Sequence, residues 1–498
     1  MVDGLRVFRG IPYAAAPVGR LRFRPPAALE PWPGVRDALE TAPAAPQKGG
    51  MLARLLAMAA LQTAEDCLTL DVWAPADPRP GAGRPVLVWI HGGSFTFGAA
   101  STPFYDGARL ARRGDVVVVH VQYRLGALGW LALPALGREE GGVLGNAGLL
   151  DQIAALHFVR ENAAVFGGDP DRVTVFGESA GAMSIGTLLA TPAAQGLFRG
   201  AILQSGAAHH AAPAERATQV GERVMRALGL AVDDLAGLRG APAAQILEAQ
   251  AAVQAVRGLA HRGLAFQPTI DGRVVPRRPD RAIAEGEGAA VPLLVGTNLD
   301  EWKLFGLADP KASRLDSEAL LRRCRRNLPG RDAAGRPHAE RIVEGYRAAR
   351  AGRASTEPRE LWFAIESDRN FRIPAIRLAE SQAGHGLACW AYLFTWASPA
   401  LDGAVGACHA LEIPFVFGRT GEEPLRGLVG DGADARALSA GMQDAWLAFA
   451  RGEAPCAQGL PEWRRYEADR RDTLVLDAEC RCVCDPLPSE RALWEGLI

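Results

Sequence analysis

The sequence predicts an α/β fold built on a mostly parallel sheet. Short apolar, β-branched runs recur along the chain, and several are apolar on both faces, as strands buried in a parallel sheet are. Helical stretches lie between them, for instance residues 146–166, whose apolar positions recur at intervals of three and four. Strand alternating with helix is typical of α/β proteins. The expected strands lie at 85–90, 115–123, 172–176, 200–205, 292–296 and 387–396.

The chain is expected to form one domain from residue 1 to residue 498. Two stretches, at roughly 207–290 and 302–385, are rich in Ala, Leu, Arg and Glu with helical periodicity and contain no obvious long core strand. We interpret them as helical insertions over the active site. No internal repeat or low-complexity linker divides the sequence, which favours a single domain over several.

Composition and charge favour a globular protein that acts on small neutral ligands. With 48% hydrophobic and 22% charged residues, the chain can bury a large core. A net charge of −1 gives no field that would attract nucleic acid or an anionic membrane. No apolar run approaches the ~18 residues that a membrane helix needs, and no secretory signal is visible, so we expect a cytoplasmic protein.

The eight cysteines predict neither a disulfide framework nor a metal site. They are scattered, apart from Cys480, Cys482 and Cys484. Their C-x-C-x-C spacing lacks the more widely spaced cysteine pairs typical of structural zinc. We therefore expect no metal, and no other cofactor is implied.

The stretch at 173–182 places a serine between a strand and a helix. Gly177-x-Ser179-x-Gly181 follows four strand-like residues and precedes the helical run AMSIGTLLA. The pattern alone is weak, since a loop serine between two glycines would also fit it. A nucleophile elbow, however, has this strand–turn–helix context and needs an acid and then a histidine later in the chain. Ser179 is therefore the predicted nucleophile.

A serine nucleophile needs a neighbouring base, because its hydroxyl is nearly unreactive at neutral pH. Three histidines lie far downstream of Ser179, at positions 338, 385 and 409. We favour His409, because it follows the strand expected at 387–396 in a loop, where catalytic groups of open parallel sheets belong. His338 and His385 both lie in polar turns and are the alternatives.

The base must in turn be oriented by a carboxylate. A strand ends at Gly296, and Asp300 and Glu301 follow it within a short loop. Both acids lie between the nucleophile and the base in the sequence, and Asp300 could instead cap a helix. The residues alone therefore leave the acid open between Asp300 and Glu301.

Acyl transfer also needs donors for the developing oxyanion, and backbone N–H groups of a glycine-rich turn supply them without reorganisation. The segment WIHGGSF at 89–95 forms such a turn directly after a strand. Gly93 and Ser94 are expected to donate, with the N–H of Ala180 as the third donor. A tight turn at the end of the strand would by itself also explain the glycines.

Several segments are more informative together than any one of them. In chain order they are FRGIPYAAAPVGRLRF (8–23), EDCLTLDVW (65–73), WIHGGSF (89–95), YRLGALGW (123–130), GNAGLLDQ (145–152), FGGDPDRVTVFGESAGAMS (166–184), FQPTIDG (266–272), GTNLDEW (296–302) and HALEIPFVFG (409–418). This series closely resembles the type B carboxylesterases, the carboxylesterase/cholinesterase family, and most of all its bacterial members active on p-nitrobenzyl-type esters. The resemblance covers nearly the whole chain.

The resemblance implies an α/β-hydrolase fold with Ser179, Glu301 and His409 as the catalytic triad. It also implies that Gly93, Ser94 and Ala180 form the oxyanion hole. Ser205 matches a serine that supports the triad by hydrogen bonding, although a strand-end serine would fit as well. Two structural salt bridges are implied, one between Arg124 and Asp169 and one between Arg22 and Glu65.

Three features depart from the family pattern. Trp302 stands where glycine commonly follows the acid, and its ring is expected either to narrow the site or to pack behind the acid. No cysteine precedes Cys67, so the disulfide of secreted relatives cannot form, which fits a reducing compartment. The apolar segment 51–62 has no tryptophan to stack on a quaternary ammonium, which disfavours choline esters. That segment is expected to form a lid at the pocket mouth or to pack on the core.

We predict a serine carboxylesterase that hydrolyses small to medium, mostly apolar esters through an acyl-enzyme. The expected partner is a small-molecule ester, with no nucleic acid and no membrane, and the protein is expected to be a monomer or small homo-oligomer. An amide or carbamate hydrolase with the same triad is the alternative. A non-catalytic binding protein of the same fold is disfavoured, because all three triad residues are present.

Overall fold

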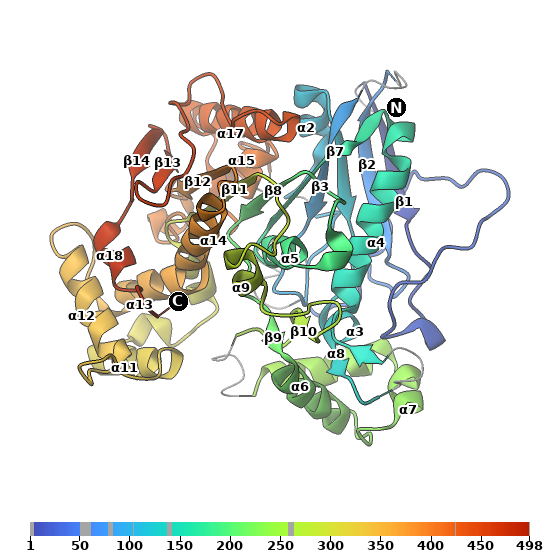
Figure 1. The fold of residues 1–498 in the computed structure, drawn as a ribbon, viewed down its shortest axis with the longest axis horizontal. Helices are drawn as coiled ribbons and strands as arrows, with labels where there is room; N and C mark the ends of the chain where they lie inside the picture. Colours follow the sequence, from blue (N-terminus) through green and yellow to red (C-terminus); the bar gives the residue numbers. More distant parts are fainter. Residues whose placement is uncertain are drawn as a thin grey trace. The chain divides into compact units, whose positions relative to one another are not determined.

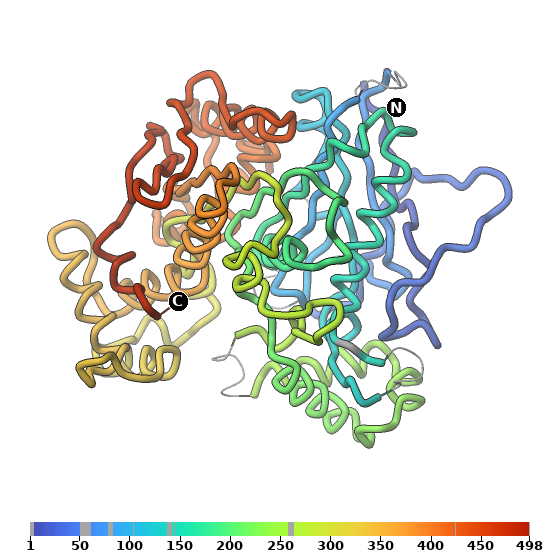
Figure 2. The backbone as a smooth tube through the Cα atoms, in the orientation of Figure 1, coloured from blue at the N-terminus to red at the C-terminus, as the bar shows by residue number. Residues whose placement is uncertain are grey.

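The computed structural model describes residues 4–49, 61–77, 83–102, 104–136, 142–256, 263–423 and 425–497. These residues divide into two compact units (Figures 1 and 2), the first made of Met1–Leu293 with Gln443–Ala457 and the second of Leu294–Met442 with Gln458–Ile498. Most of the segment expected to be a lid, residues 51–60, lies outside the described residues.

The first unit contributes six strands to the main sheet, in the order β1-β2-β4-β3-β7-β8. The β4-β3-β7-β8 part is parallel, and β2 pairs antiparallel with both β1 and β4. The four strands expected here from the sequence are all present. The bounds are β1 (Leu5–Pro12), β2 (Thr69–Pro75), β3 (Arg84–Ile90), β4 (Val117–Val121), β7 (Gly168–Glu178) and β8 (Gly200–Gln204).

Helices cover the strands of the first unit, which explains their continuous apolar runs. Every residue of β3 and of β4 is buried. Helix α5 (Ala180–Leu189) packs on β7 and β8, α4 (Ala147–Asn162) on β7, and α2 (Gly107–Gly114) on β2 and β4 (Figure 1). The parallel sheet is therefore the rigid base from which loops at the strand ends project.

The range 207–290 holds four helices and two short strands among its described residues. Helices α6, α7 and α8 gather beside α3 (Gly126–Trp130) (Figure 1). A two-strand sheet of β5 and β6 packs against α6. The bounds are β5 (Ala132–Leu133), β6 (Val143–Leu144), β9 (Ala212–Pro213), α6 (Ala214–Ala227), α7 (Leu235–Gly240), α8 (Ala243–Gln254), β10 (Thr269–Ile270) and α9 (Pro279–Ala284).

The second unit contains strands β11-β12-β13-β14 in that order, with β12 and β13 parallel and β14 antiparallel to β13. The strands expected at 292–296 and 387–396 are β11 (Leu293–Asn298) and β12 (Cys389–Phe394). They are followed by β13 (Asp472–Leu476) and β14 (Arg481–Cys484).

Helices of the second unit form their own core around Tyr346, Trp362 and Trp494. A π-helical turn, η7, joins α13 directly to α14. Helix α17 (Ala433–Arg451) begins in the second unit and ends in the first. The other bounds are α10 (Glu301–Leu307), α11 (Ser317–Asn327), α12 (His338–Arg350), α13 (Pro358–Ser367), η7 (Asp368–Arg372), α14 (Ile373–Gly384), α15 (Ile413–Val416), α16 (Arg426–Val429) and α18 (Pro488–Ala492).

Of the two expected salt bridges, one is present, and the prediction of the other is wrong. Arg22 pairs with Glu65, its Nε lying 2.6 Å from Oε2. Arg124 pairs with Asp151 instead of Asp169, through bonds of 2.8 and 2.6 Å that engage both carboxylate oxygens. Helix α4 carries Asp151 into the core beside Arg124, where both are almost fully buried. Asp169 is half-buried and accepts the N–H of Asp171 instead.

No helix among the described residues is long and apolar enough to cross a membrane. The described residues also bring together no group of three or more side chains that could hold a metal ion.

A buried carboxyl on β2 links stability to pH. Asp71 accepts the N–H of Gly10 at 2.8 Å, and burial raises its pKa to about 6. Because the pKa of Asp71 is higher in the folded protein than in the unfolded chain, protonation of Asp71 stabilises the folded protein. This stabilisation is lost as the pH rises from about 4 to 6. Over that interval, we expect the unfolding free energy of Asp71→Asn to rise by up to roughly 3 kcal/mol relative to that of the wild type.

Urea unfolding at pH 4 to 7 measures this difference, with Asp37→Asn as the matched variant because Asp37 is exposed. A difference between wild type and Asp71→Asn that stays constant with pH would contradict the assignment.

Candidate active site

Ser179 lies at a sharp turn between β7, which ends at Glu178, and α5, which begins at Ala180. Its backbone angles, φ 55° and ψ −122°, are ones that an L-residue rarely adopts. Its N–H donates to Gln204 O at 2.9 Å, and its own carbonyl accepts the N–H of Met183 at 2.8 Å. The turn is therefore held in its strained form by β8 on one side and by α5 on the other.

The glycines around Ser179 are required by close backbone approach. A Cβ at Gly177 would lie 2.6 Å from Ile90 O, and one at Gly181 would lie 1.9 Å from the same oxygen. A Cβ at Gly206 would lie 2.8 Å from Ser179 O. The ends of β3 and β8 thus press against the turn, and this is the physical reason for the G-x-S-x-G pattern.

The predicted oxyanion loop follows β3 and lies against the same turn. A Cβ at Gly92 would lie 3.0 Å from the Cβ of Ser179. Gly93 has a φ of +118°, and its carbonyl accepts the N–H groups of Thr96 and Phe97, so the loop curls back on itself. Among the described residues, the N–H groups of Gly93, Ser94 and Ala180 have no acceptor. Three backbone donors near the serine are therefore available to a ligand.

His91, which the sequence did not single out, fixes the start of this loop. Its Nδ1 lies 2.8 Å from Gly92 O, and because a carbonyl only accepts, Nδ1 carries the proton. Burial lowers the His91 pKa to about 4, so the ring is neutral near pH 7. The ring stacks on Tyr123 at 4.5 Å, and the Tyr123 hydroxyl donates to His91 O at 2.7 Å.

In the second unit, Glu301 contacts His409. Glu301 is the first residue of α10, three residues after the end of β11, and its Oε2 lies 2.5 Å from His409 Nδ1. The side chains are 0% and 5% exposed, respectively. Of the two acids left open by the sequence, Asp300 is the one that does not contact His409 here. It accepts the N–H of Ala407 and pairs with Lys303, and it caps no helix N–H.

Asn298, also missed from the sequence, ties the acid to the histidine loop. Its backbone N–H donates to Glu301 Oε1 at 2.8 Å. Its Nδ2 donates to Cys408 O at 2.7 Å and to Glu412 Oε2 at 2.6 Å. Asn298 thus holds the Glu301 carboxylate through its backbone N–H and the backbone before His409 through its side-chain amide.

Aromatic rings surround the His409 imidazole. Phe305 and Phe371 lie 5.0 and 4.8 Å from it, centroid to centroid. Trp302 packs against Phe305 at 4.9 Å and joins the helical core of the second unit. Of the two expectations for Trp302, the structure therefore favours packing behind the acid. The alternative bases lie elsewhere in the fold, with His338 starting α12 and His385 following α14.

The predicted site residues thus form two groups. Ser179, Gly93, Ser94 and Ala180 belong to the first unit, and Glu301 and His409 belong to the second. Ser205 follows β8, and its buried Oγ has no hydrogen-bond partner among the described residues. Its supporting role stays a prediction.

Comparison with known proteins identifies relatives along the whole chain. The family model described as "Carboxylesterase family" matches residues 2–489. The chain is 39% identical to the para-nitrobenzyl esterase of Bacillus subtilis, over 98% of this chain and 94% of that protein. It is 36% identical to the phenmedipham hydrolase of Pseudarthrobacter oxydans, over 96% and 92%.

Solved structures agree with these matches. The carboxylesterase EST55 of Geobacillus stearothermophilus superposes with a TM-score of 0.87 at 39% identity, covering 99% of this chain and 97% of that one. A PNB esterase structure superposes with a TM-score of 0.84 at 37% identity, covering 99% and 96%.

The close approach of Ile90 O to Gly181 can be tested by measuring the free energy of unfolding. Gly181→Ala is expected to lower the free energy of unfolding by about 1–3 kcal/mol, because the new Cβ meets a backbone atom that cannot rotate away. Thermal and urea unfolding measure the change. Gly240→Ala is the matched variant, since a Cβ there meets nothing within 4 Å, and it should cost nothing. Equal stability of the two variants would refute the close approach.

Proposed function

The chain belongs to the carboxylesterase family and has the α/β-hydrolase fold, and on this premise we propose that Ser179, His409 and Glu301 act as one triad that hydrolyses carboxylic esters. The observation that carries the proposal is the strained serine turn lying against a loop whose N–H groups lack acceptors. The buried contact between Glu301 and His409 supports it from the second unit.

In the proposed mechanism Ser179 Oγ attacks the ester carbonyl while His409 takes its proton. Because Glu301 engages Nδ1, the proton goes to Nε2. The Glu301 carboxylate holds this tautomer and stabilises the imidazolium that forms. His409 then protonates the leaving alkoxide, and a water molecule activated by the same base releases the acid from Ser179.

The N–H groups of Gly93, Ser94 and Ala180 are proposed to stabilise the oxyanion. Donors fixed in place before the reaction cost no reorganisation when the charge develops, and each is typically worth about 3 kcal/mol. The curled loop and the first turn of α5 supply such fixed donors. No step is assigned to a metal or an organic cofactor.

Small to medium, mostly apolar esters are the proposed substrates. The similarity to a para-nitrobenzyl esterase makes aryl and benzyl esters the first candidates. Amide or carbamate hydrolysis by the same triad is the alternative, and it demands better-timed protonation of an amine leaving group by His409. A single domain, a monomer or small homo-oligomer, and a cytoplasmic location remain predictions.

Hydrolysis of p-nitrophenyl acetate, butyrate, octanoate and laurate tests the nucleophile. Ser179→Ala is expected to lower kcat/KM at least about 10⁴-fold on every ester that the wild type hydrolyses. Ser313→Ala is the matched serine variant, because Ser313 is exposed on a surface turn, and it should leave the rates unchanged. A folded wild type no faster than Ser179→Ala on all four esters would refute the proposal. Comparing the rates on p-nitrophenyl butyrate and p-nitrobutyranilide, which carry the same acyl group, separates esterase from amidase activity.

The role of Asn298 is tested by kinetics as well. Asn298→Ala removes the side-chain hydrogen bonds to Cys408 O and Glu412, which hold the loop of His409 in place. We therefore expect kcat to fall about 10–100-fold while KM changes little. Asn327→Ala is the matched variant, since Asn327 also donates to a buried glutamate, Glu366, in the second unit. An equal loss of kcat in both variants would indicate a general effect on stability instead of positioning.

A further inference from the structure

A cavity lies within the second unit between strands β11–β13 and helix α14, and none of its lining residues belongs to the proposed triad or oxyanion loop. The space in it that water-sized spheres can occupy is about 30 Å³. The total empty volume, which includes the opening to solvent, is about 410 Å³. Because a single water needs about 10–15 Å³ of such space, the enclosed part holds about two to three water-sized groups, and a ligand of a few heavy atoms would extend into the opening.

Small residues create this space. Ala375 and Ala379 are one turn apart on α14 and face the strands without filling the gap. At Gly296 on β11, a Cβ would lie 2.3 Å from the Tyr392 ring, so only glycine lets that ring lie flat against the strand. The walls are therefore mostly apolar.

One polar group inside the cavity wall lacks a partner. Tyr466 lines the cavity and is 2% exposed, and its hydroxyl has no hydrogen-bond partner among the described residues. Burial raises the pKa of this phenol, so the hydroxyl keeps its proton and acts as a donor. A buried donor without an acceptor is unfavourable, and an oxygen atom entering the cavity would satisfy it.

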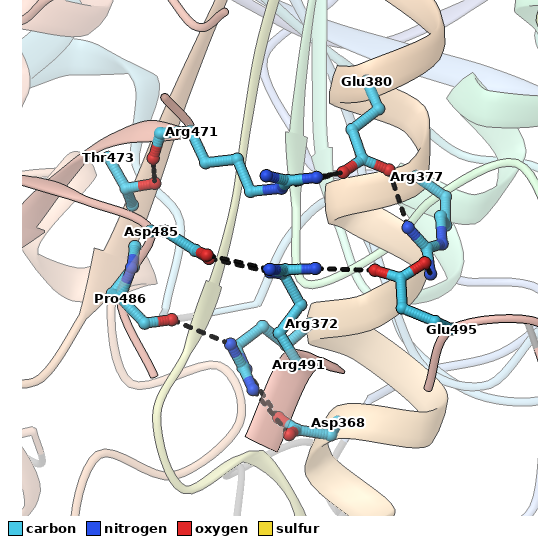
Figure 3. A network of polar contacts seen from close by, with 10 residues as sticks. All are labelled: Asp368, Arg372, Arg377, Glu380, Arg471, Thr473, Asp485, Pro486, Arg491 and Glu495. Carbon is cyan, nitrogen blue, oxygen red and sulfur yellow. Dashed lines mark hydrogen bonds and ion pairs between the residues drawn. The ribbon is translucent and has the colours of Figure 1, made fainter. Parts of the chain in front are cut away.

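The charged residues that line the cavity, Arg372, Arg471 and Asp485, belong to a network of paired charges (Figure 3). Arg372 lines the cavity and is held by both oxygens of Asp368 at 2.6 Å and by Pro486 O at 3.1 Å. Arg471 donates to Glu380 at 2.9 Å. The remaining charges of the network are Arg377, Arg491, Asp485 and Glu495, which pair with one another or with Glu380.

Each arginine of this network thus has a carboxylate, and each carboxylate an arginine. A charged ligand would have to break one of these ion pairs and leave its partner uncompensated, which costs far more than the ligand gains. These paired charges therefore favour neutral ligands.

We propose that this cavity is a binding site for a small, neutral, mostly apolar molecule with one acceptor oxygen, such as a short ketone or alcohol. The apolar part lies against Ala375, Ala379 and the Tyr392 ring, and the oxygen accepts a hydrogen bond from the Tyr466 hydroxyl. Binding here is independent of the proposed ester hydrolysis, because no lining residue takes part in it.

Titration of the full chain with 2-butanone, followed by ligand-observed NMR, tests the site. The Ser179→Ala background separates it from the proposed active site. Saturable binding is expected with a Kd on the order of millimolar, as suits a ligand of five heavy atoms. Tyr466→Phe should weaken binding about tenfold, the size of one hydrogen bond. Ala379→Leu should abolish it by filling the cavity, and if that variant fails to fold, Ala375→Val replaces it.

Two controls make the result decisive. Ala383→Leu adds the same side chain on α14 outside the cavity and should leave the affinity unchanged. Propanoate, which has five heavy atoms like the probe but carries a charge, should bind at least about tenfold more weakly. The proposal is overturned if the protein shows no saturable binding of 2-butanone, if Tyr466→Phe and the filled variant bind it as well as the parent does, or if propanoate binds equally.

Discussion

The carbonyl oxygen of Ile90 occupies the space that side chains at positions 177 and 181 would need, and this close approach sets the geometry of the serine turn. From the other side, Gln204 O holds the backbone N–H of Ser179. A backbone conformation of this kind costs about 1–3 kcal/mol and persists only where surrounding structure enforces it. Strands β3, β7 and β8 supply that enforcement, because they are buried and hydrogen-bonded in register. The strained conformation of Ser179 therefore depends on the sheet as much as on the turn.

Features that depend on neighbouring residues in the chain could be predicted from the sequence. Buried parallel strands are apolar on both faces, so β3, β4 and β7 were found within a few residues of their bounds. The serine turn was recognisable because its glycines and its strand–turn–helix context lie within one short segment. The resemblance to the carboxylesterases extended this local information to the acid and the base.

Features that depend on contacts between distant segments were harder to predict. Spacing alone could not choose between Asp300 and Glu301, because the choice depends on which side chain the first turn of α10 aims at His409. The partner of Arg124 was assigned wrongly for a related reason. Asp151 reaches it because α4 packs against α3, the helix that begins two residues after Arg124. Asn298 gave no signal, since an amide at the end of a strand has no distinctive pattern, and its three bonds exist only in the folded chain.

Cys408 places a second potential nucleophile directly before the proposed base. Its thiol is buried, and burial together with the nearby carboxylates of Glu301 and Glu412 raises its pKa to about 12. Only a thiolate attacks carbonyls or alkylating reagents efficiently, so this sulfur stays inert at neutral pH. The Glu301 carboxylate that contacts the histidine thus also helps to keep the sulfur beside it protonated. Chemical labelling and oxidation are directed instead to the more accessible thiols of Cys456, Cys482 and Cys484, none of which adjoins the proposed catalytic groups in sequence.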